Sequence, residues 1–144
     1  MVLKIIKIDT LDYKKMVELR TQILRIPLGL SLSQIDLEMD KEDILMGYFD
    51  DSSLELIACC ILTKIDTDII KLRQMAVGEK WQGQGFGKSL ILYAEGWAKN
   101  YGFKKIVLNA RKVSSGFYQT LGYRVTGNEF IEVNIPHIKM KKNI

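Results

Sequence analysis

Residues 72–89 read LRQMAVGEKWQGQGFGKS. The apolar residues up to Val77 predict the end of a buried strand, and Gly78 with the two charged residues after it breaks that strand. Glycine then recurs at positions 83, 85 and 87, directly before a segment with helical periodicity. Glycines at alternate positions clear side chains from a bend, and a helix N-terminus behind the bend adds unpaired N–H donors and a positive dipole end. The stretch therefore predicts an anion site, suited to phosphate or pyrophosphate.

Two common phosphate motifs do not fit this loop. The dinucleotide fingerprint requires G-x-G-x-x-G and an acidic residue ending a strand about 20 residues later. Here the glycines run G-x-G-x-G, and no such acidic residue follows. The P-loop requires four residues between its first glycine and Gly-Lys-Ser. Gly87-Lys88-Ser89 has that ending, but Gly83 lies one residue too close. The loop therefore belongs to another kind of phosphate site.

The rest of the chain alternates strand and helix patterns without a repeat, a low-complexity tract or a linker. Thr10 is placed to cap the first helix, Pro27 to stop it, and Gly102 to end the helix after the glycine loop. Helices are expected at residues 10–26, 88–101 and 113–121, with a short helical piece within 30–43. Strands are expected at residues 2–8, 44–49, 54–64, 69–77, 104–110, 123–126 and 131–140, the last interrupted at Pro136. This order predicts one mixed α/β domain over residues 1–144.

Composition narrows the class of protein. The chain has 144 residues, of which 47% are hydrophobic and 26% charged, as in ordinary globular domains. Its longest uninterrupted apolar run, residues 56–62, is too short to span a bilayer, and residues 1–10 lack the pattern of a signal peptide, so a cytoplasmic protein is expected. The net charge of +4 is spread along the chain apart from Lys139, Lys141 and Lys142, so it does not by itself indicate nucleic acid and suits a small anionic ligand at least as well.

The two cysteines do not indicate catalysis. Cys59 and Cys60 are adjacent in an apolar run, so on a strand they point to opposite faces of the sheet and cannot make a disulfide framework. Core packing is the expected role for both. No metal-ligand set is identified in the sequence.

The glycine loop and a second motif together resemble the GNAT superfamily of acyl-CoA-dependent N-acetyltransferases. The first motif, [Gln/Arg]-x-x-Gly-x-[Gly/Ala], is QGQGFG at residues 82–87, and the second, Phe-Tyr-x-x-Leu-Gly-[Phe/Tyr], lies within SSGFYQTLGY at residues 114–123. The resemblance covers residues 69–140. It implies a mostly antiparallel central sheet of six to seven strands flanked by about four helices.

Three shorter segments look like the ElaA-type branch of that superfamily. They are LR at residues 19–20, NAR at 109–111 and FIEVNIPHIKM at 130–140. That branch usually has glycine where this chain has Asn134. If the backbone there is left-handed, asparagine is the best tolerated replacement. The resemblance does not supply the acceptor.

The resemblance implies that acetyl-CoA is the cosubstrate. Its pantetheine arm is expected to pair with the strand edge at Met75 and Val77 through their backbones, while their side chains pack in the core. The family places the pyrophosphate on the loop and helix start, and the residues carried over are Gln82, Gly83, Gln84, Gly85, Phe86, Gly87, Lys88 and Ser89. Asn109, which ends a strand beside the cleft, is also expected to contact the cosubstrate. Related enzymes often have asparagine at the position of Arg111, so a phosphate contact and a solvated side chain both stay open for that residue.

The catalytic assignments also come from the resemblance. Tyr118 occupies the family position of the general acid that protonates the departing CoA thiolate, although packing on the sheet is the alternative role for its ring. Glu132 and His137 are candidates for a base that acts on the amine directly or through water, and either residue could instead be structural or contact the substrate. Histidine as a residue type changes protonation near neutral pH. Many family members use water alone.

Two functions remain open at this stage. The first is acetyl transfer from acetyl-CoA to a primary amine by direct attack in a ternary complex. The second is a non-catalytic acyl-CoA-binding regulatory domain. The acceptor is a small molecule or a protein amine, and the acidic residues within 36–43 offer one way to recruit a cationic amine. Homodimers are common in the superfamily, and the sequence leaves the oligomeric state open.

Overall fold

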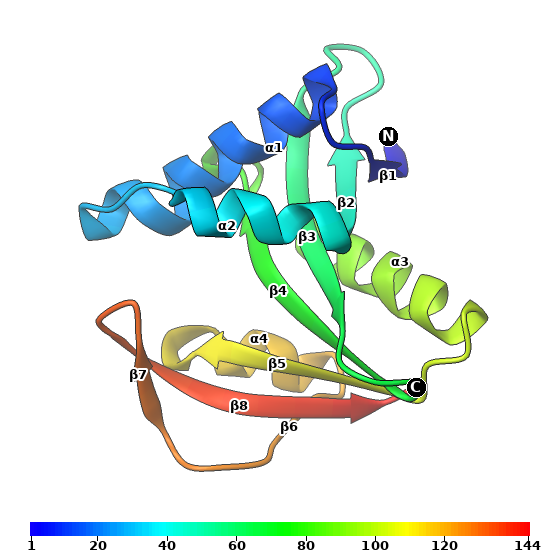
Figure 1. Ribbon diagram of the computed structural model, residues 1–144, viewed down its shortest axis with the longest axis vertical. Coiled ribbons are helices and arrows are strands. Elements are labelled where there is room, and N and C mark those ends of the chain that lie inside the picture. Colours follow the sequence, from blue (N-terminus) through cyan, green and yellow to red (C-terminus); the bar gives the residue numbers. More distant parts are fainter.

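Eight strands form one sheet in the structure, a computed structural model that describes residues 1–144 (Figure 1). The strands are β1 (Val2–Ile6), β2 (Ile44–Phe49), β3 (Leu56–Lys64), β4 (Ile69–Val77), β5 (Lys105–Arg111), β6 (Arg124–Val125), β7 (Phe130–Glu132) and β8 (Ile135–Asn143). The helices are α1 (Leu11–Arg20), α2 (Gln34–Met39), α3 (Phe86–Asn100) and α4 (Ser115–Thr120). The order across the sheet is β1-β2-β3-β4-β5-β8-β6, and β7 pairs with β8. The mixed, mostly antiparallel architecture expected from the sequence is confirmed, with eight strands in place of six to seven.

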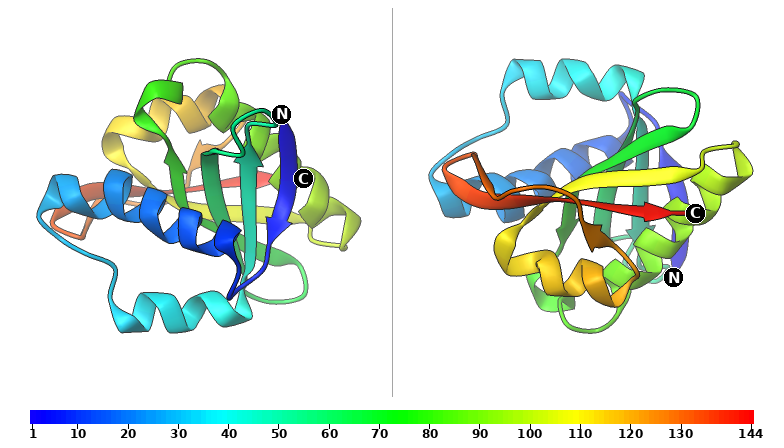
Figure 2. Two further views of the ribbon diagram at one scale, coloured as in Figure 1. Left: turned by 90° about the horizontal axis from the view of Figure 1, so that it is seen from above. Right: turned by 90° about the horizontal axis from the view of Figure 1, so that it is seen from below.

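Helices cover both faces of the sheet and bury two separate apolar clusters. Figure 2 shows α1 on one face of β2–β4 and α3 on the other. The period-2 alternation of β3 divides its side chains between the clusters. Cys59 packs with Met16 and Leu19 of α1, whereas Cys60 packs with Leu90 and Ile91 of α3. Both thiols are fully buried, as the sequence indicated.

Strands β4 and β5 are paired along only part of their length. These strands form the single parallel pair of the sheet, and their pairing stops at Leu72 opposite Leu108. Beyond that point β4 and β5 diverge, as Figure 1 shows, while β4 keeps its pairing with β3 and β5 keeps its pairing with β8. A bulge in β4 accompanies the divergence, because Gln74 has φ +54° and the register with β3 shifts there.

Three sequence expectations need correction. The first helix begins at the Thr10 cap as expected but ends at Arg20, and a π turn (Thr21–Arg25) and a 3₁₀ turn (Ile26–Leu28) continue the chain. The last strand is interrupted by a two-residue turn at Val133 and Asn134, both with positive φ, and Pro136 lies within β8. The helix expected over residues 88–101 ends at Asn100, so Tyr101 lies beyond α3 and is 68% exposed, with its ring stacked on Trp97.

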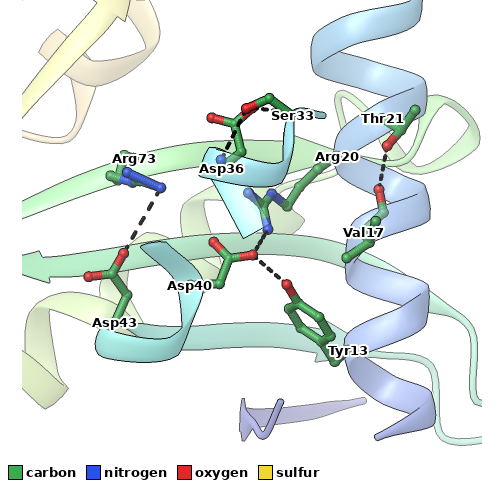
Figure 3. Close-up of polar contacts among 9 residues, drawn as sticks. All are labelled: Tyr13, Val17, Arg20, Thr21, Ser33, Asp36, Asp40, Asp43 and Arg73. Atoms are coloured by element: carbon green, nitrogen blue, oxygen red, sulfur yellow. Dashed lines mark hydrogen bonds and ion pairs between the residues drawn. The ribbon is translucent and has the colours of Figure 1, made fainter. Parts of the chain in front are cut away.

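A buried ion pair joins α1 to the segment after α2. The Arg20 Nη1 atom lies 2.7 Å from the Asp40 Oδ2 atom, and both side chains are 0% exposed. The Tyr13 hydroxyl donates to the same oxygen at 2.6 Å, and burial together with this bond to Asp40 raises the pKa of Tyr13 to about 12 (Figure 3). A capping box between Ser33 and Asp36 starts α2 in the same region. These bonds hold the segment that carries α2 against α1.

We predict that Arg20→Met lowers the free energy of unfolding by about 3–5 kcal/mol, because it leaves the Asp40 carboxylate buried without its partner. Urea denaturation measures the change. The double variant Arg20→Met/Asp40→Leu removes both charges and is expected to be more stable than the single variant. Lys41→Met is the control, because its ion pair with Glu38 is exposed on both sides. A loss from Arg20→Met as small as that from Lys41→Met would contradict this account.

Candidate active site

A cavity of about 790 Å³ lies where β4 and β5 diverge. One end is bounded by the glycine loop and the start of α3, and the other by the turn after α1 and the β7–β8 hairpin. The sequence-predicted residues that line it are Met75, Val77, Gln82, Gly83, Gly85, Phe86, Gly87, Lys88, Asn109, Tyr118, Glu132 and His137. Two of the predicted residues, Gln84 and Ser89, do not line the cavity.

The glycine loop presents a row of free backbone donors. None of the N–H groups of residues 83–88 has a hydrogen-bond acceptor in the chain, whereas the Ser89 N–H already bonds the Gly85 carbonyl. Gly83 and Gly85 have φ of +74° and +87°, values that glycine adopts without strain. The Gln82 and Gln84 side chains brace the loop by donating to the Val77 and Lys80 carbonyls. Free donors at a helix N-terminus fit a pyrophosphate.

Gly87 allows α3 to approach the strand edge. A Cβ at this position would lie 3.3 Å from both the Met75 Cε and Val77 Cγ2 atoms, tighter than ordinary contact. Phe86 packs its ring edge-on against Tyr48 and Trp81, so its contribution to the loop is its backbone N–H. The close approach brings the free donors next to the strand edge at Met75 and Val77.

Tyr118 projects from α4 into the same cavity. Its side chain is 8% exposed, and its ring packs edge-on against Phe117 and Tyr123. The packing role is confirmed because the ring lies in the core cluster, and the residue also lines the cavity, while its role as an acid stays a prediction. No acceptor or donor in the chain bonds this hydroxyl. Burial raises the pKa of Tyr118, so the phenol stays protonated and available as a donor.

Glu132 and His137 meet on the β7–β8 hairpin at the other end of the cavity. The His137 Nδ1 atom lies 2.9 Å from the Ile135 carbonyl oxygen, which only accepts, so Nδ1 carries the proton. In the neutral ring the lone pair is therefore on Nε2, which lies 3.8 Å from the Glu132 Oε2 atom. The Glu132 carboxylate therefore lies beside the ring nitrogen that carries the lone pair.

Several cavity residues were not singled out in the sequence. Ile23, Leu24 and Arg25 come from the turn after α1, and Lys71 and Arg73 come from β4 upstream of the predicted contacts. No local motif marks them, since the π turn after α1 and the divergence of β4 bring them to the cavity.

The acidic segment does not face this cavity. The Asp36 carboxylate accepts from the Ser33 N–H, Asp40 pairs with Arg20, and Asp43 lies 4.0 Å from Arg73. Burial raises the pKa of Asp43 despite the nearby arginine. These carboxylates therefore hold α2 and the following turn in place, and the structure does not support their use in recruiting a cationic amine.

A family model described as an acetyltransferase (GNAT) domain matches residues 35–144. YyaT of Bacillus subtilis, an uncharacterized protein, is 34% identical over 74 residues, which cover 51% of this chain and 50% of YyaT. The chain thus spans about half the length of the curated relatives it matches first.

Solved structures share the whole fold. Escherichia coli ElaA aligns over 99% of both chains with a TM-score of 0.85 and 18% sequence identity. A GNAT family acetyltransferase from Elizabethkingia anophelis, solved with acetyl-CoA bound, covers 99% of this chain and 97% of its own, with a TM-score of 0.75 and 22% identity. None of the helices of this chain has the length and hydropathy needed to cross a membrane.

We predict that Gly85→Asp weakens the binding of acetyl-CoA about tenfold or more, because it places a carboxylate among the donors that fit the pyrophosphate. Isothermal titration calorimetry measures the dissociation constant. Gly102→Asp is the matched control, since Gly102 has the same φ of +87° and the same open surroundings but lies at the far end of α3. Equal affinities of the two variants would show that the loop does not hold the pyrophosphate.

Proposed function

The chain belongs to the GNAT acetyltransferase family, and from that premise we propose that it transfers an acetyl group from acetyl-CoA to a primary amine by direct attack in a ternary complex. One observation carries the proposal. The free N–H groups of residues 83–88 and the unpartnered Tyr118 hydroxyl open into a single cavity along the β4 edge. A phosphate site and a proton donor at two places in one cleft suit a long cosubstrate whose reactive group lies away from its charged end.

The donor end uses backbone groups. The pyrophosphate of acetyl-CoA would sit on the loop donors, with Lys88 adding a positive charge at the same end. The pantetheine amides would pair with β4 beyond Leu72, where β5 no longer does. A backbone N–H of this strand edge would also stabilise the oxyanion that forms when the acetyl carbonyl is attacked. Asn109 lines the cavity from β5 and would contact the same cosubstrate.

The transfer needs two proton movements. The neutral amine attacks the acetyl carbonyl, a C–N bond forms and the C–S bond breaks. The Tyr118 hydroxyl gives its proton to the departing sulfur, so CoA leaves as a thiol and the phenol is reprotonated from water. The attacking nitrogen loses one proton to His137 Nε2, directly or through water, with Glu132 facing the imidazolium that results. The products are an amide and CoA.

Neither cysteine suits an acyl-enzyme intermediate. Cys59 and Cys60 are fully buried in the two apolar clusters, and burial raises the pKa of Cys59 to about 12. A thiol at that pKa supplies almost no thiolate at neutral pH. Direct attack by the amine is therefore the mechanism of the proposal. Two free thiols also accord with a cytoplasmic protein, which we keep as part of the proposal.

We predict that Tyr118→Phe lowers kcat about 10²–10⁴-fold while the dissociation constant of acetyl-CoA stays within about twofold, because the variant loses only the proton donor. Thiol release from acetyl-CoA in the presence of an amine panel measures kcat. Tyr123→Phe is the matched control. Its ring is buried in the same apolar cluster as Tyr118, but its hydroxyl donates to Glu95, and the residue does not line the cavity. An unchanged kcat in a folded Tyr118→Phe variant would remove the acid from the mechanism.

A second prediction concerns the base. The plot of kcat/KM against pH is expected to fall on its acidic side, and His137→Gln should flatten that side because Nε2 no longer takes up a proton. Glu132→Gln should keep the fall on the acidic side and lower the maximum value of kcat/KM. If Glu132→Gln alone flattens the profile, the carboxylate is the base. Water acts alone if both variants keep the wild-type shape.

If no member of a broad amine and peptide panel causes thiol release while acetyl-CoA binds tightly, this proposal is rejected. The chain would then be a non-catalytic acyl-CoA-binding domain.

A further inference from the structure

The cavity is strongly basic at the end away from the glycine loop. Its charged lining consists of five basic residues and one carboxylate, namely Arg25, Lys71, Arg73, Lys88, Arg111 and Glu132. Lys88 belongs to the glycine-loop end, and Arg73 lies 4.0 Å from Asp43. Positive charge in excess of what the chain itself neutralises therefore remains around the acceptor end.

Two arginines converge there without a carboxylate between them. The Arg25 Nη1 atom and the Arg111 Nη2 atom donate to the same oxygen, the Leu24 carbonyl, at 3.1 and 3.3 Å. Neither guanidinium has a carboxylate within 4.0 Å, although the Asp36 carboxylate is near enough to interact with Arg25 electrostatically. Partial burial and the charge of Arg25 lower the pKa of Arg111. One carbonyl oxygen cannot neutralise two cations, so neither guanidinium has a directly paired carboxylate, and Asp36 offsets only part of the charge of Arg25.

This arginine pair lies beside the reacting end of the cavity. Arg111 is the last residue of β5 and is paired directly with His137 of β8, so their side chains share one face of the sheet. His137 in turn faces Glu132. The arginines come from the turn after α1 and from β5, and no group of the glycine loop contacts them. Their position is that of an acceptor site and not of a pyrophosphate site.

We propose that the acceptor is a small amine that also carries an oxyanion, a carboxylate or a phosphate, held by Arg25 and Arg111. This proposal rests on the acetyl transfer proposed above and names the class of its acceptor. Guanidinium groups bind carboxylate and phosphate oxygens through paired N–H donors, and two of them side by side match such a group in charge and geometry. Amino acids and phosphorylated amino alcohols have both required groups in one small molecule.

The same charges act on the amine. A positive environment disfavours the ammonium form, so more of the bound acceptor has the lone pair that attack requires. A polycation would instead be repelled by the basic lining, and no carboxylate of the acidic segment lines the cavity to attract it. The electrostatics therefore favour an acceptor whose anionic group offsets the arginines.

The experiment compares matched acceptors in the thiol-release assay at saturating acetyl-CoA. Alanine is paired with alaninamide and phosphoethanolamine with ethanolamine, so each pair differs in the anionic group. We expect kcat/KM to be about tenfold or more higher for the anionic member of at least one pair, and the pair that responds identifies carboxylate or phosphate. In Arg25→Gln and Arg111→Gln this preference should fall about tenfold, mainly through KM.

Arg124→Gln is the control, because it removes an exposed arginine of β6 that does not line the cavity, and it should keep the wild-type preference. Equal or better use of the members that lack an anionic group, or of a peptide N-terminal amine, overturns the acceptor class while leaving acetyl transfer intact. A loss of acetyl-CoA affinity in either cavity arginine variant also overturns it, since the pair would then serve the cosubstrate. If none of the acceptors causes thiol release, the proposed function itself is rejected, which is a distinct result.

Discussion

Strand β4 has a neighbour on both sides only as far as Leu72, and the rest of the site depends on this constraint. A sheet that stayed paired beyond that residue would have no cavity and no free edge for an amide-bearing arm. The bulge at Gln74 and the approach of α3 at Gly87 both act on the unpaired part of the strand. The glycine loop follows directly from the end of the same strand, so its free N–H groups open into the space that the divergence creates.

The glycine-loop end of the cavity, the proposed donor site, is local in sequence, and this explains why the residues that line it could be predicted together. Residues 75–88 form one continuous segment whose glycine spacing follows from backbone needs, and the positive φ at Gly83 and Gly85 shows those needs directly. The strands and the long helix were predicted closely because their apolar periodicity is strong. Asn134 was expected to tolerate a left-handed backbone, and its φ of +64° confirms this.

The opposite end of the cavity, the proposed acceptor site, is assembled from distant segments, so no single stretch of sequence predicts it. Arg25 and Arg111 are 86 positions apart and meet because the π turn after Arg20 lies beside the end of β5. The π turn itself was missed, since residues 21–26 continue a helical period. The acidic segment gave the opposite error. Its charges look available in the sequence, whereas three of its carboxylates, Asp36, Asp40 and Asp43, interact with Ser33, Arg20 and Arg73.

The alternation of Cys59 and Cys60 between two apolar clusters has a consequence for how such an enzyme diversifies. Ile23 and Leu24 at the acceptor end pack with the cluster beneath α1, whereas Met75 and Val77 at the donor end pack with the cluster beneath α3. The sheet lies between the two. Substitutions that reshape one cluster are therefore expected to combine almost additively with those in the other. Substitutions on one side of the sheet can then change the proposed acceptor site while the proposed acetyl-CoA cleft on the other side stays unchanged.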